Sequence, residues 1–232
     1  MRLEKLLSPG KIGTLELKNR FVVPPMGTNF ATYDGEVTDE MIACYRRRAR
    51  GGFGLIIIEV TAIDRKGKAI VNEAGLWEDA QIPGFRKLMD AIHEEGGKVV
   101  VQLHHAGRQS VPPYIFNEMP EAPSRVACPM LNYIPEAMTN ARVWEVIDAF
   151  GDAAVRAKKA GADGVVYEQG GTEHTCSGYD TIVPALGVRP DNPLEEAVRA
   201  LGKEVYVIGD AAKPAPANKA TEAALEAVLK LG

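Results

Sequence analysis

The chain has few cysteines and no long apolar run. Three of its 232 residues are cysteine, and they lie far apart in the sequence, at Cys44, Cys128 and Cys176. This spacing excludes a disulfide framework and a CxxC metal site, and it predicts a reducing, cytoplasmic location. No stretch approaches the roughly 18 apolar residues of a membrane helix. The first residues also lack the apolar core of a signal peptide. We therefore expect no membrane partner.

An excess of charge of either sign is also missing. The formal net charge is -4, and basic residues form no stripe. Nucleic acid is therefore not expected as a partner. The pattern GxGxxG does not occur in the sequence either, so the chain lacks the loop that seats a dinucleotide pyrophosphate. The hydrophobic fraction of 46% and charged fraction of 25% are those of an ordinary globular protein.

Apolar runs alternate with segments of helical spacing in the first 167 residues. The apolar runs are residues 21–25, 55–60, 98–103 and 164–167. Nearly continuous runs of this kind predict parallel strands that are buried on both faces. The helical segments are residues 38–50, with Thr38 as N-cap, 84–95 and 140–160. This alternation predicts an α/β fold with a parallel sheet.

Two loops at the carboxyl ends of the predicted strands are unusually long. Residues 26–37 and 104–139 are rich in proline, glycine, asparagine and serine. In parallel α/β folds the ligand site is built by loops at this end of the strands. Plain connectors are the alternative, although structureless loops of this length are uncommon. Beyond residue 166 the pattern changes to a hairpin at Gly170 and Gly171, a short strand in "GKEVYVIGDAA" and a helix over 221–231.

Several motifs are typical of a known family. In the first part these are "LLSPGKIGTLELKNRFVVPPMGTNF", "GGFGLIIIEVTAI", "VVVQLHHAGRQ" and "APS". On these motifs, from residue 6 to about 165, the chain resembles the Old Yellow Enzyme family and, within it, the NADH:flavin oxidoreductase and 2,4-dienoyl-CoA reductase branch. The later motifs "YDTIVPALGVRPDNPL" and "VYVIGDAAKP" resemble the C-terminal end of the FAD/NAD(P)-binding module that is fused to the barrel in that branch.

The resemblance implies a fold with two incomplete parts. We expect residues 1–162 to be the N-terminal part of an FMN-binding TIM (β/α) barrel. Residues 163–232 are expected to be a small β-rich/α remnant of a Rossmann-like FAD/NAD(P)-binding domain. The join falls at 161–165, where we infer an internal deletion. The family's histidine, asparagine and tyrosine motif, its late flavin phosphate site and its iron–sulfur cysteines are not recognised in the sequence.

The implied activity is hydride transfer from NAD(P)H through FMN to an activated alkene, as in an ene-reductase. We expect weak or lost FMN binding, loss of the FAD and iron–sulfur cluster, and impaired turnover; the catalytic residues are unknown. The alternative is a non-catalytic remnant that serves as an assembly or interaction module. Open sheet edges would suit a homo-oligomer in either case.

The resemblance also assigns residues to the cofactor. Backbone groups of Pro25, Met26, Gly27 and Thr28 would meet the flavin ring, and Gly27 allows a close approach of the backbone. The backbone of Val60 would add a contact. The Gln102 amide has a donor and an acceptor that match the flavin pyrimidine edge. Asp210 would accept hydrogen bonds from the ribityl chain in the parent protein.

Other polar residues are given structural roles. Glu59 is either a buried acid or a salt-bridged structural carboxylate, and we favour the salt-bridged carboxylate. His104 and His105 invite a metal assignment, but adjacent strand residues point apart and no third ligand has suitable spacing. We therefore predict no metal site and place both histidines in the structure or the substrate pocket. Arg108 would meet an anionic group, cap a helix or form a salt bridge.

Overall fold

The computed structural model describes residues 4–167, 195 and 199–200. The chain divides into two compact units, residues 1–183 and 184–232. In the second unit, Arg199 Nη2 lies 2.9 Å from Oε1 of Glu195, four residues earlier in the sequence. The hairpin, strand and helix expected after residue 167, together with Asp210, lie outside the described residues. None of the described helices is long and apolar enough to span a lipid bilayer.

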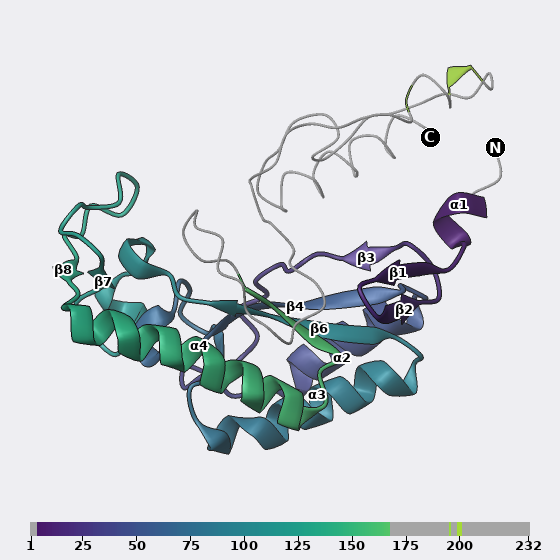
Figure 1. Cartoon of the computed structure of the whole chain (residues 1–232), viewed down its shortest axis with the longest axis horizontal. Helices are drawn as coiled ribbons and strands as arrows, with labels where there is room; N and C mark the ends of the chain where they lie inside the picture. Colours follow the sequence, from purple (N-terminus) through teal and green to yellow (C-terminus); the bar gives the residue numbers. More distant parts are fainter. Residues whose placement is uncertain (1–3, 168–194, 196–198, 201–232) are drawn as a thin grey trace. The chain divides into compact units, whose positions relative to one another are not determined.

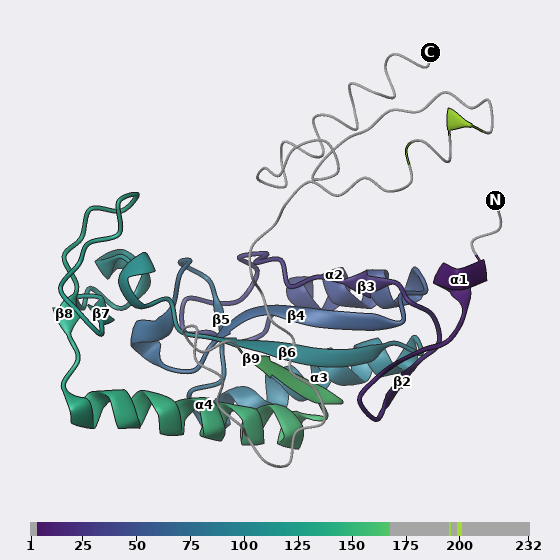
Figure 2. The same ribbon diagram turned by 45° about the horizontal axis from the view of Figure 1, so that its top comes forward.

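A parallel sheet forms the centre of the first unit (Figure 1). Its strands lie in the order β3 (Val22–Val23), β4 (Leu55–Ala62), β6 (Lys98–His104) and β9 (Gly164–Tyr167), and β5 (Ala74–Gly75) pairs with the end of β4. The helices α2 (Asp39–Arg50), α3 (Ile82–Glu94) and α4 (Asn140–Ala160) connect the strands and lie along one side of the sheet (Figure 2). The alternation of strand and helix in the sequence is thereby confirmed.

Prolines and capping residues determine where several of the strands and helices begin and end. The first predicted strand is shorter than expected, because Pro24 and Pro25 have no N–H to continue a ladder. The second and third strands extend beyond their apolar runs to Ala62 and His104. Thr38 is the N-cap of α2, and its side chain accepts the Met41 N–H at 3.2 Å. The predicted helix 140–160 and strand 164–167 have the observed bounds.

The short elements were not predicted. They include α1 (Glu4–Leu7) and an antiparallel hairpin of β1 (Gly10–Ile12) and β2 (Leu15–Leu17). The parallel pair β7 (Glu121–Ala122) and β8 (Glu136–Ala137) lies within the long loop after β6. One-turn 3₁₀ helices occupy Arg65–Gly67, Asp79–Gln81, Gly107–Gln109 and Pro112–Tyr114. Segments of two to four residues leave little periodicity in a sequence.

The sheet separates two hydrophobic clusters. The larger cluster lies between the sheet and the helices and includes Ile56, Ile58, Val101 and Leu103. The smaller one contains Leu17, Leu55 and Val100, with Ile12, Leu15 and Ile57 packed against them. Because side chains alternate along a strand, the smaller cluster lies on the opposite face of the sheet. We call this face, which carries Leu55 and Val100, the inner face; the β1–β2 hairpin packs against it.

Asp163 ties the start of β9 to the rest of the sheet. Its Oδ2 accepts the Val99 N–H at 2.8 Å and lies 2.9 Å from His93 Nε2, and its Oδ1 accepts Lys98 Nζ at 3.2 Å. Burial alone would raise the pKa of Asp163, but these three partners outweigh it and lower the pKa. The segment in which the sequence places the join is therefore well anchored on its β6 side.

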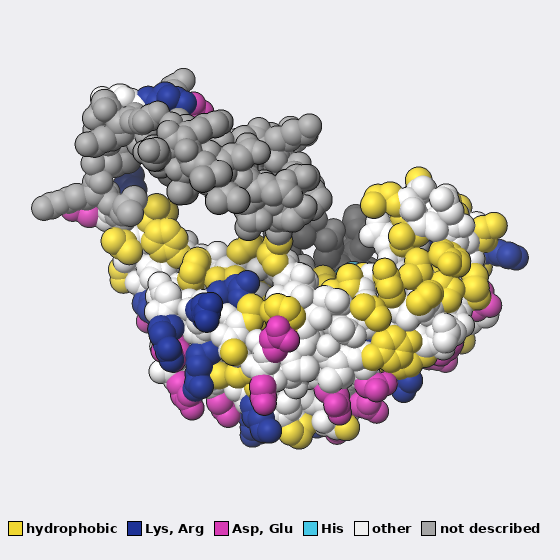
Figure 3. Space-filling view, turned by 180° about the vertical axis from the view of Figure 1, so that it is seen from behind, with side chains coloured by type: hydrophobic (Ala, Val, Ile, Leu, Met, Phe, Trp, Pro, Cys, Tyr) yellow, Lys and Arg dark blue, Asp and Glu magenta, His cyan; other side chains and the backbone are white. Residues whose placement is uncertain are grey.

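Large apolar side chains gather on the surface over the β7–β8 region and the adjoining α4 (Figure 3). Met130 is 86% exposed and Trp144 is 66% exposed; Val126 and Ile134 are also exposed. We call this set the apolar patch. Exposed patches of this kind commonly mark contact surfaces.

A bulge in β4 places Glu59 among the helices. The register between β4 and β6 shifts between Ile58 and Val60, so Glu59 lies beside Ile58 on the helix side and Val60 returns to the inner face. Glu59 is fully buried. The Tyr45 hydroxyl of α2 donates to Glu59 Oε2 at 3.1 Å and accepts the Glu59 N–H at 2.9 Å. Two elements of the fold are thus joined by one buried side chain.

We expect Tyr45→Phe to lower the free energy of unfolding by about 1–3 kcal/mol, because a buried N–H and a carboxylate oxygen each lose a partner. Urea unfolding measures the change. Tyr133→Phe is the control, since Tyr133 is 40% exposed. Equal stability of the two variants would contradict the role given to Tyr45.

Candidate functional site

The carboxyl ends of β3, β4 and β6 lie side by side in the sheet. Val60 on β4 is the register partner of Gln102 on β6. The segment 25–28, which follows β3, lies next to them: a Cβ added at Gly27 would stand 3.8 Å from Val60 Cγ2. The structure therefore brings together six of the seven residues that the sequence assigns to a cofactor. The seventh, Asp210, lies outside the described residues.

Gln102 points to the inner face. Its neighbours Val101 and Leu103 belong to the helix-side cluster, and side chains alternate along the strand. Gln102 is half-buried, and no described side chain or backbone group makes a hydrogen bond to its amide. Its donor and acceptor are therefore available to a ligand on this face.

Glu59, which lies on the helix side of the sheet, holds the segment 25–28 through a hydrogen bond. The Thr28 N–H donates to Glu59 Oε2 at 2.9 Å. Burial raises the pKa of Glu59, although the bonds from Thr28 and Tyr45 partly offset this effect. No ion pair involves Glu59 among the described residues, so the predicted salt bridge is wrong: its partners are an N–H and a hydroxyl. Sequence reasoning did not foresee this support.

A second buried carboxylate, Glu73, lies beside the same segment. Glu73 Oε1 is 3.0 Å from Nδ1 of His104, the last residue of β6. Its Oε2 accepts the N–H groups of Ala69 and Ile70. Ile70 in turn meets Gly27, since a Cβ at Gly27 would lie 3.3 Å from Ile70 Cδ1. No local sequence pattern predicts that Glu73 pairs with His104, because the two residues are 31 positions apart.

Lys68 fixes the loop that carries Glu73. Its side chain is fully buried, and Nζ donates to the carbonyl oxygens of Tyr33 at 2.5 Å and Val71 at 2.8 Å. Nζ also lies 4.3 Å from the centre of the Tyr33 ring. Burial lowers the pKa of Lys68, and the nearby Glu73 and Asp34 oppose this change. The loops after β3 and β4 are thereby joined.

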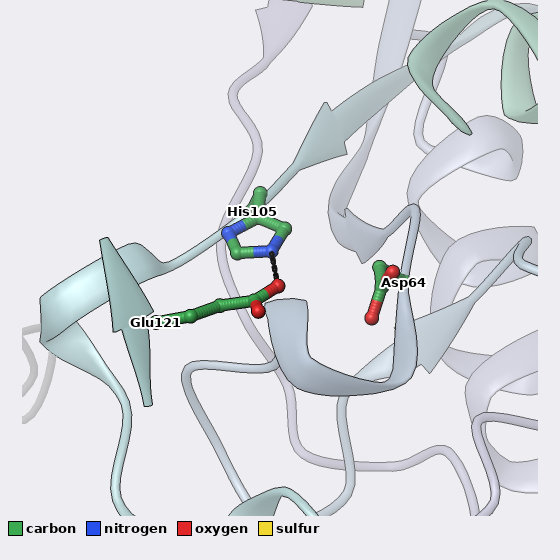
Figure 4. A group of neighbouring side chains, drawn as sticks. All are labelled: Asp64, His105 and Glu121. Atoms are coloured by element: carbon green, nitrogen blue, oxygen red, sulfur yellow. Dashed lines mark ion pairs between the residues drawn. The ribbon is translucent and has the colours of Figure 1, made fainter. Parts of the chain in front are cut away.

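A separate charged cluster contains His105, Asp64 and Glu121 (Figure 4). Their potential ligand atoms all lie within 4.8 Å of one another, so two carboxylates that spacing did not reveal do surround one histidine. However, Arg142 of α4 donates to Glu121 Oε1 at 2.5 Å and to Asp64 Oδ2 at 2.6 Å. This guanidinium supplies the positive charge that the carboxylates require. We interpret the cluster as an ion-pair network and assign it no metal.

The remaining candidate residues give weaker evidence for a ligand site. Arg108 is exposed, and its Nη1 lies 3.5 Å from the Ala127 carbonyl oxygen. Cys128 is buried and Cys44 is half-buried, and Cys176 lies outside the described residues. An open cavity of about 570 Å³ beside Arg142 is lined by charges that already pair with one another, such as Arg156 with Asp79 nearby. The inner face at Gln102 is the better candidate for a ligand.

The donor set on this face fits one edge of a flavin. Gly27, Val60 and the Gln102 amide lie together at this end of the sheet, because Val60 is the register partner of Gln102 and its Cγ2 lies 3.8 Å from where a Cβ of Gly27 would stand. The donor and the acceptor of the Gln102 amide match the alternating carbonyl and N–H groups of a planar heterocycle.

Comparisons with known proteins identify the family to which this chain belongs. A family model described as the NADH:flavin oxidoreductase / NADH oxidase family matches residues 5–171. The NADH oxidase of Thermoanaerobacter brockii is 45% identical over 161 residues, which are 69% of this chain and 25% of that protein. The NADPH dehydrogenase of Listeria monocytogenes serotype 4b is 38% identical over 194 residues, which are 82% of this chain and 54% of that protein.

A solved structure of 2-naphthoyl-CoA reductase with 2-naphthoyl-CoA superposes with a TM-score of 0.68 at 32% identity, over 72% of this chain and 27% of that one. This chain thus spans between about a quarter and about half of the length of these relatives. The matches confirm the predicted resemblance at the level of the family. They also confirm the α/β class, since these relatives have the TIM-barrel fold.

The ion-pair network generates a prediction about pH. Burial alone would raise the pKa of Glu121, but its contacts with His105 and Arg142 lower the pKa from 4.5 to about 2. A lowered carboxyl pKa stabilises the fold above the ordinary pKa, and the stabilisation is lost as pH falls from about 4.5 toward 2. We expect Arg142→Met to cost about 3 kcal/mol at pH 7 and progressively less below pH 4.5.

Urea unfolding at a series of pH values measures this cost. Arg46→Met is the matched control, because the Arg46–Glu94 pair is exposed on both sides and should contribute less than about 1 kcal/mol. A cost of Arg142→Met that does not change with pH would contradict the account.

Proposed function

The chain belongs to the NADH:flavin oxidoreductase / NADH oxidase family, and from this premise we propose that it holds FMN on the inner face of its sheet. Pro25, Met26, Gly27 and Thr28 would contact the ring through their backbone, with Val60 beside them and Gln102 at the pyrimidine edge. The observation that carries the proposal is the convergence of these residues at the ends of three adjacent strands. Flavin supplies hydride transfer when bound.

The protein's own part in the reaction is to bind and orient. The Gln102 amide would fix the direction of the ring with one donor and one acceptor. Gly27 would let the backbone approach the ring plane, and Glu59 holds the adjacent Thr28 N–H from behind. The proposed reductant is NAD(P)H, which the family uses. The proposed substrate is a small activated alkene, and the proposed location is the cytoplasm.

We assign the chain to the 2,4-dienoyl-CoA reductase branch. Two relatives support this assignment: the chain covers 25% of the NADH oxidase and 27% of the 2-naphthoyl-CoA reductase, so both are much longer proteins. A fused FAD/NAD(P)-binding module would account for the extra length. Residues 1–162 are then the start of the barrel, and residues 163–232 are the end of that module, with an internal deletion at the join.

The deletion limits the proposed activity. The barrel segment provides one edge of the flavin pocket, and a (β/α)₈ barrel needs eight strands to close around its cofactor. We therefore propose that FMN binds weakly and that turnover is impaired. The FAD and iron–sulfur cluster of the branch would be lost, and Asp210 would no longer contact a cofactor.

A second candidate function is a non-catalytic assembly module. The apolar patch favours it, since Met130 and Trp144 are exposed without belonging to either core cluster. The sheet also has β3 and β9 at its ends, and neither pairs on its outer side with another described strand. A second copy of the chain would suit these edges. This candidate predicts an oligomer that does not bind flavin.

A flavin titration distinguishes the two candidates. We expect saturable FMN binding, measured by the change in flavin absorbance near ~450 nm, and loss of most of the flavin on a desalting column. Gln102→Ala should weaken binding about fivefold, as expected for one lost hydrogen-bonding side chain. Gln109→Ala is the control, because Gln109 is exposed in the 3₁₀ turn Gly107–Gln109. The absence of saturable binding would favour the assembly module, and tight retention would contradict the proposed impairment.

A further inference from the structure

The sequence "LELKNR" over residues 15–20 alternates between side chains that face the sheet and side chains that face solvent. The members that pack in the smaller hydrophobic cluster or are buried beside it are Leu15, Leu17 and Asn19. The exposed members are Glu16, Lys18 and Arg20. Because successive side chains of an extended segment point to opposite sides, the three charged side chains share the side that faces away from the sheet.

Lys11 on β1 adds a third cation to this charged side. It is the register partner of Glu16 on β2, and residues that lie opposite each other in an antiparallel pair project to the same side. None of Lys11, Lys18 and Arg20 forms an ion pair with a carboxylate in the part of the chain that the structure describes. Three cations therefore share this side of the hairpin with one carboxylate, and all three remain available to a ligand.

These four charged side chains line one cavity. Its volume is about 560 Å³, and Pro9, Gly10 and Leu17 complete its lining. A volume of this size lies within the range of roughly 300–1,000 Å³ that small-molecule sites occupy. We call it the basic cavity. With three cations against one carboxylate, it attracts an anion that carries more than one negative charge.

Arg20 is held in place by contacts that leave part of its guanidinium unused. Its Nε donates to Ser8 Oγ at 3.3 Å, and its Nη2 donates to the Pro9 carbonyl oxygen at 3.3 Å. The preceding residue, Asn19, is anchored through a hydrogen bond of 2.7 Å from its Nδ2 to the Gly52 carbonyl oxygen. No described group accepts a hydrogen bond from Arg20 Nη1. A fixed guanidinium with free N–H groups suits the oxygens of a phosphate.

The basic cavity lies away from the proposed flavin face. The hairpin packs against Leu55 and Val100, near the amino ends of β4 and β6, whereas Gln102 lies near the carboxyl end of β6. Figure 1 shows the hairpin and the β7–β8 pair, which belongs to the loop after β6, at opposite ends of the sheet. A ligand in the basic cavity would therefore leave the flavin face open.

We propose that the basic cavity binds a diphosphate group, which inorganic pyrophosphate and nucleoside diphosphates share. The fixed guanidinium of Arg20 would bind oxygens of one phosphate, and the ammonium groups of Lys11 and Lys18 would neutralise the remaining charge. A diphosphate offers more negative charges than a carboxylate or a single phosphate, and this matches three cations in one cavity. The inference does not rest on the proposed function, because none of these residues belongs to the flavin face.

Calorimetric titration of the full chain with sodium pyrophosphate tests the proposal. We expect saturable binding that Lys11→Gln and Lys18→Gln each weaken about fivefold, since each removes one charged donor. Neither ammonium group has a described partner, so these changes should leave the urea unfolding of the protein unaltered. Glu16→Gln should strengthen binding about twofold, because it removes the only negative charge of the lining.

Lys87 provides a matched control for the two lysines. It lies on α3, is exposed and has no ion pair among the residues that the structure describes. Lys87→Gln changes the net charge of the protein by the same amount as Lys18→Gln, but at a position that does not line the basic cavity. It should bind pyrophosphate as the unmodified protein does.

Two further titrations distinguish the sources of the diphosphate. Adenosine diphosphate that binds about as tightly as pyrophosphate shows that the diphosphate carries the recognition. Adenosine diphosphate that binds more tightly, while adenosine alone does not bind, assigns the cavity to a nucleotide. In NMR spectra, either ligand should shift the backbone N–H signals of Gly10 and Lys11, which line the cavity.

Two results would overturn the proposal. One is the absence of saturable binding of both pyrophosphate and adenosine diphosphate. The other is binding that Lys11→Gln and Lys18→Gln weaken no more than Lys87→Gln does, which would show general attraction of an adventitious ion only. Neither result depends on the FMN titration, so the proposed function and this inference can fail separately.

Discussion

The hydrogen bonds of the buried Glu59 carboxylate are the constraint on which the candidate site depends. One oxygen accepts both the Thr28 N–H and the Tyr45 hydroxyl, so a single side chain of β4 joins the segment after β3 to helix α2. The carboxylate reaches this position because the bulge in β4 turns Glu59 away from the inner face. The same bulge returns Val60 to that face. An ordinary strand would have exchanged these two residues and left an acidic group where the flavin edge is proposed to lie.

The other buried charges extend this arrangement without entering the site. Lys68 holds the loop after β4 to the backbone of the loop after β3, and Glu73 joins the same loop to the end of β6. Buried ionic groups are costly unless they are fully partnered, and both of these have partners in the loops they connect. The result is an end of the sheet whose loops are fixed by buried polar contacts, and at which no described group makes a hydrogen bond to the Gln102 amide.

Much of this could be predicted from the sequence, because the signals were local. The helix 140–160 has a threonine N-cap and a glycine end, and the strand 164–167 is a short apolar run between polar residues, so both have the predicted bounds. The site residues Val60 and Gln102 followed from motifs of the family. The bulge did not, because a continuous apolar run gives no sign of the face on which each residue lies. Glu73 with His104 and Arg142 with Asp64 are 31 and 78 residues apart, and their pairing depends on the folded loops.

The central claim is that the ends of β3, β4 and β6 form one edge of a flavin pocket in this chain. A crystal structure of the protein grown with excess FMN tests it most directly. The account predicts flavin density on the inner face, with the pyrimidine edge at the Gln102 amide and the ring beside Gly27 and Val60. Flavin bound elsewhere, or an inner face that stays closed to it at saturating FMN, would contradict the claim.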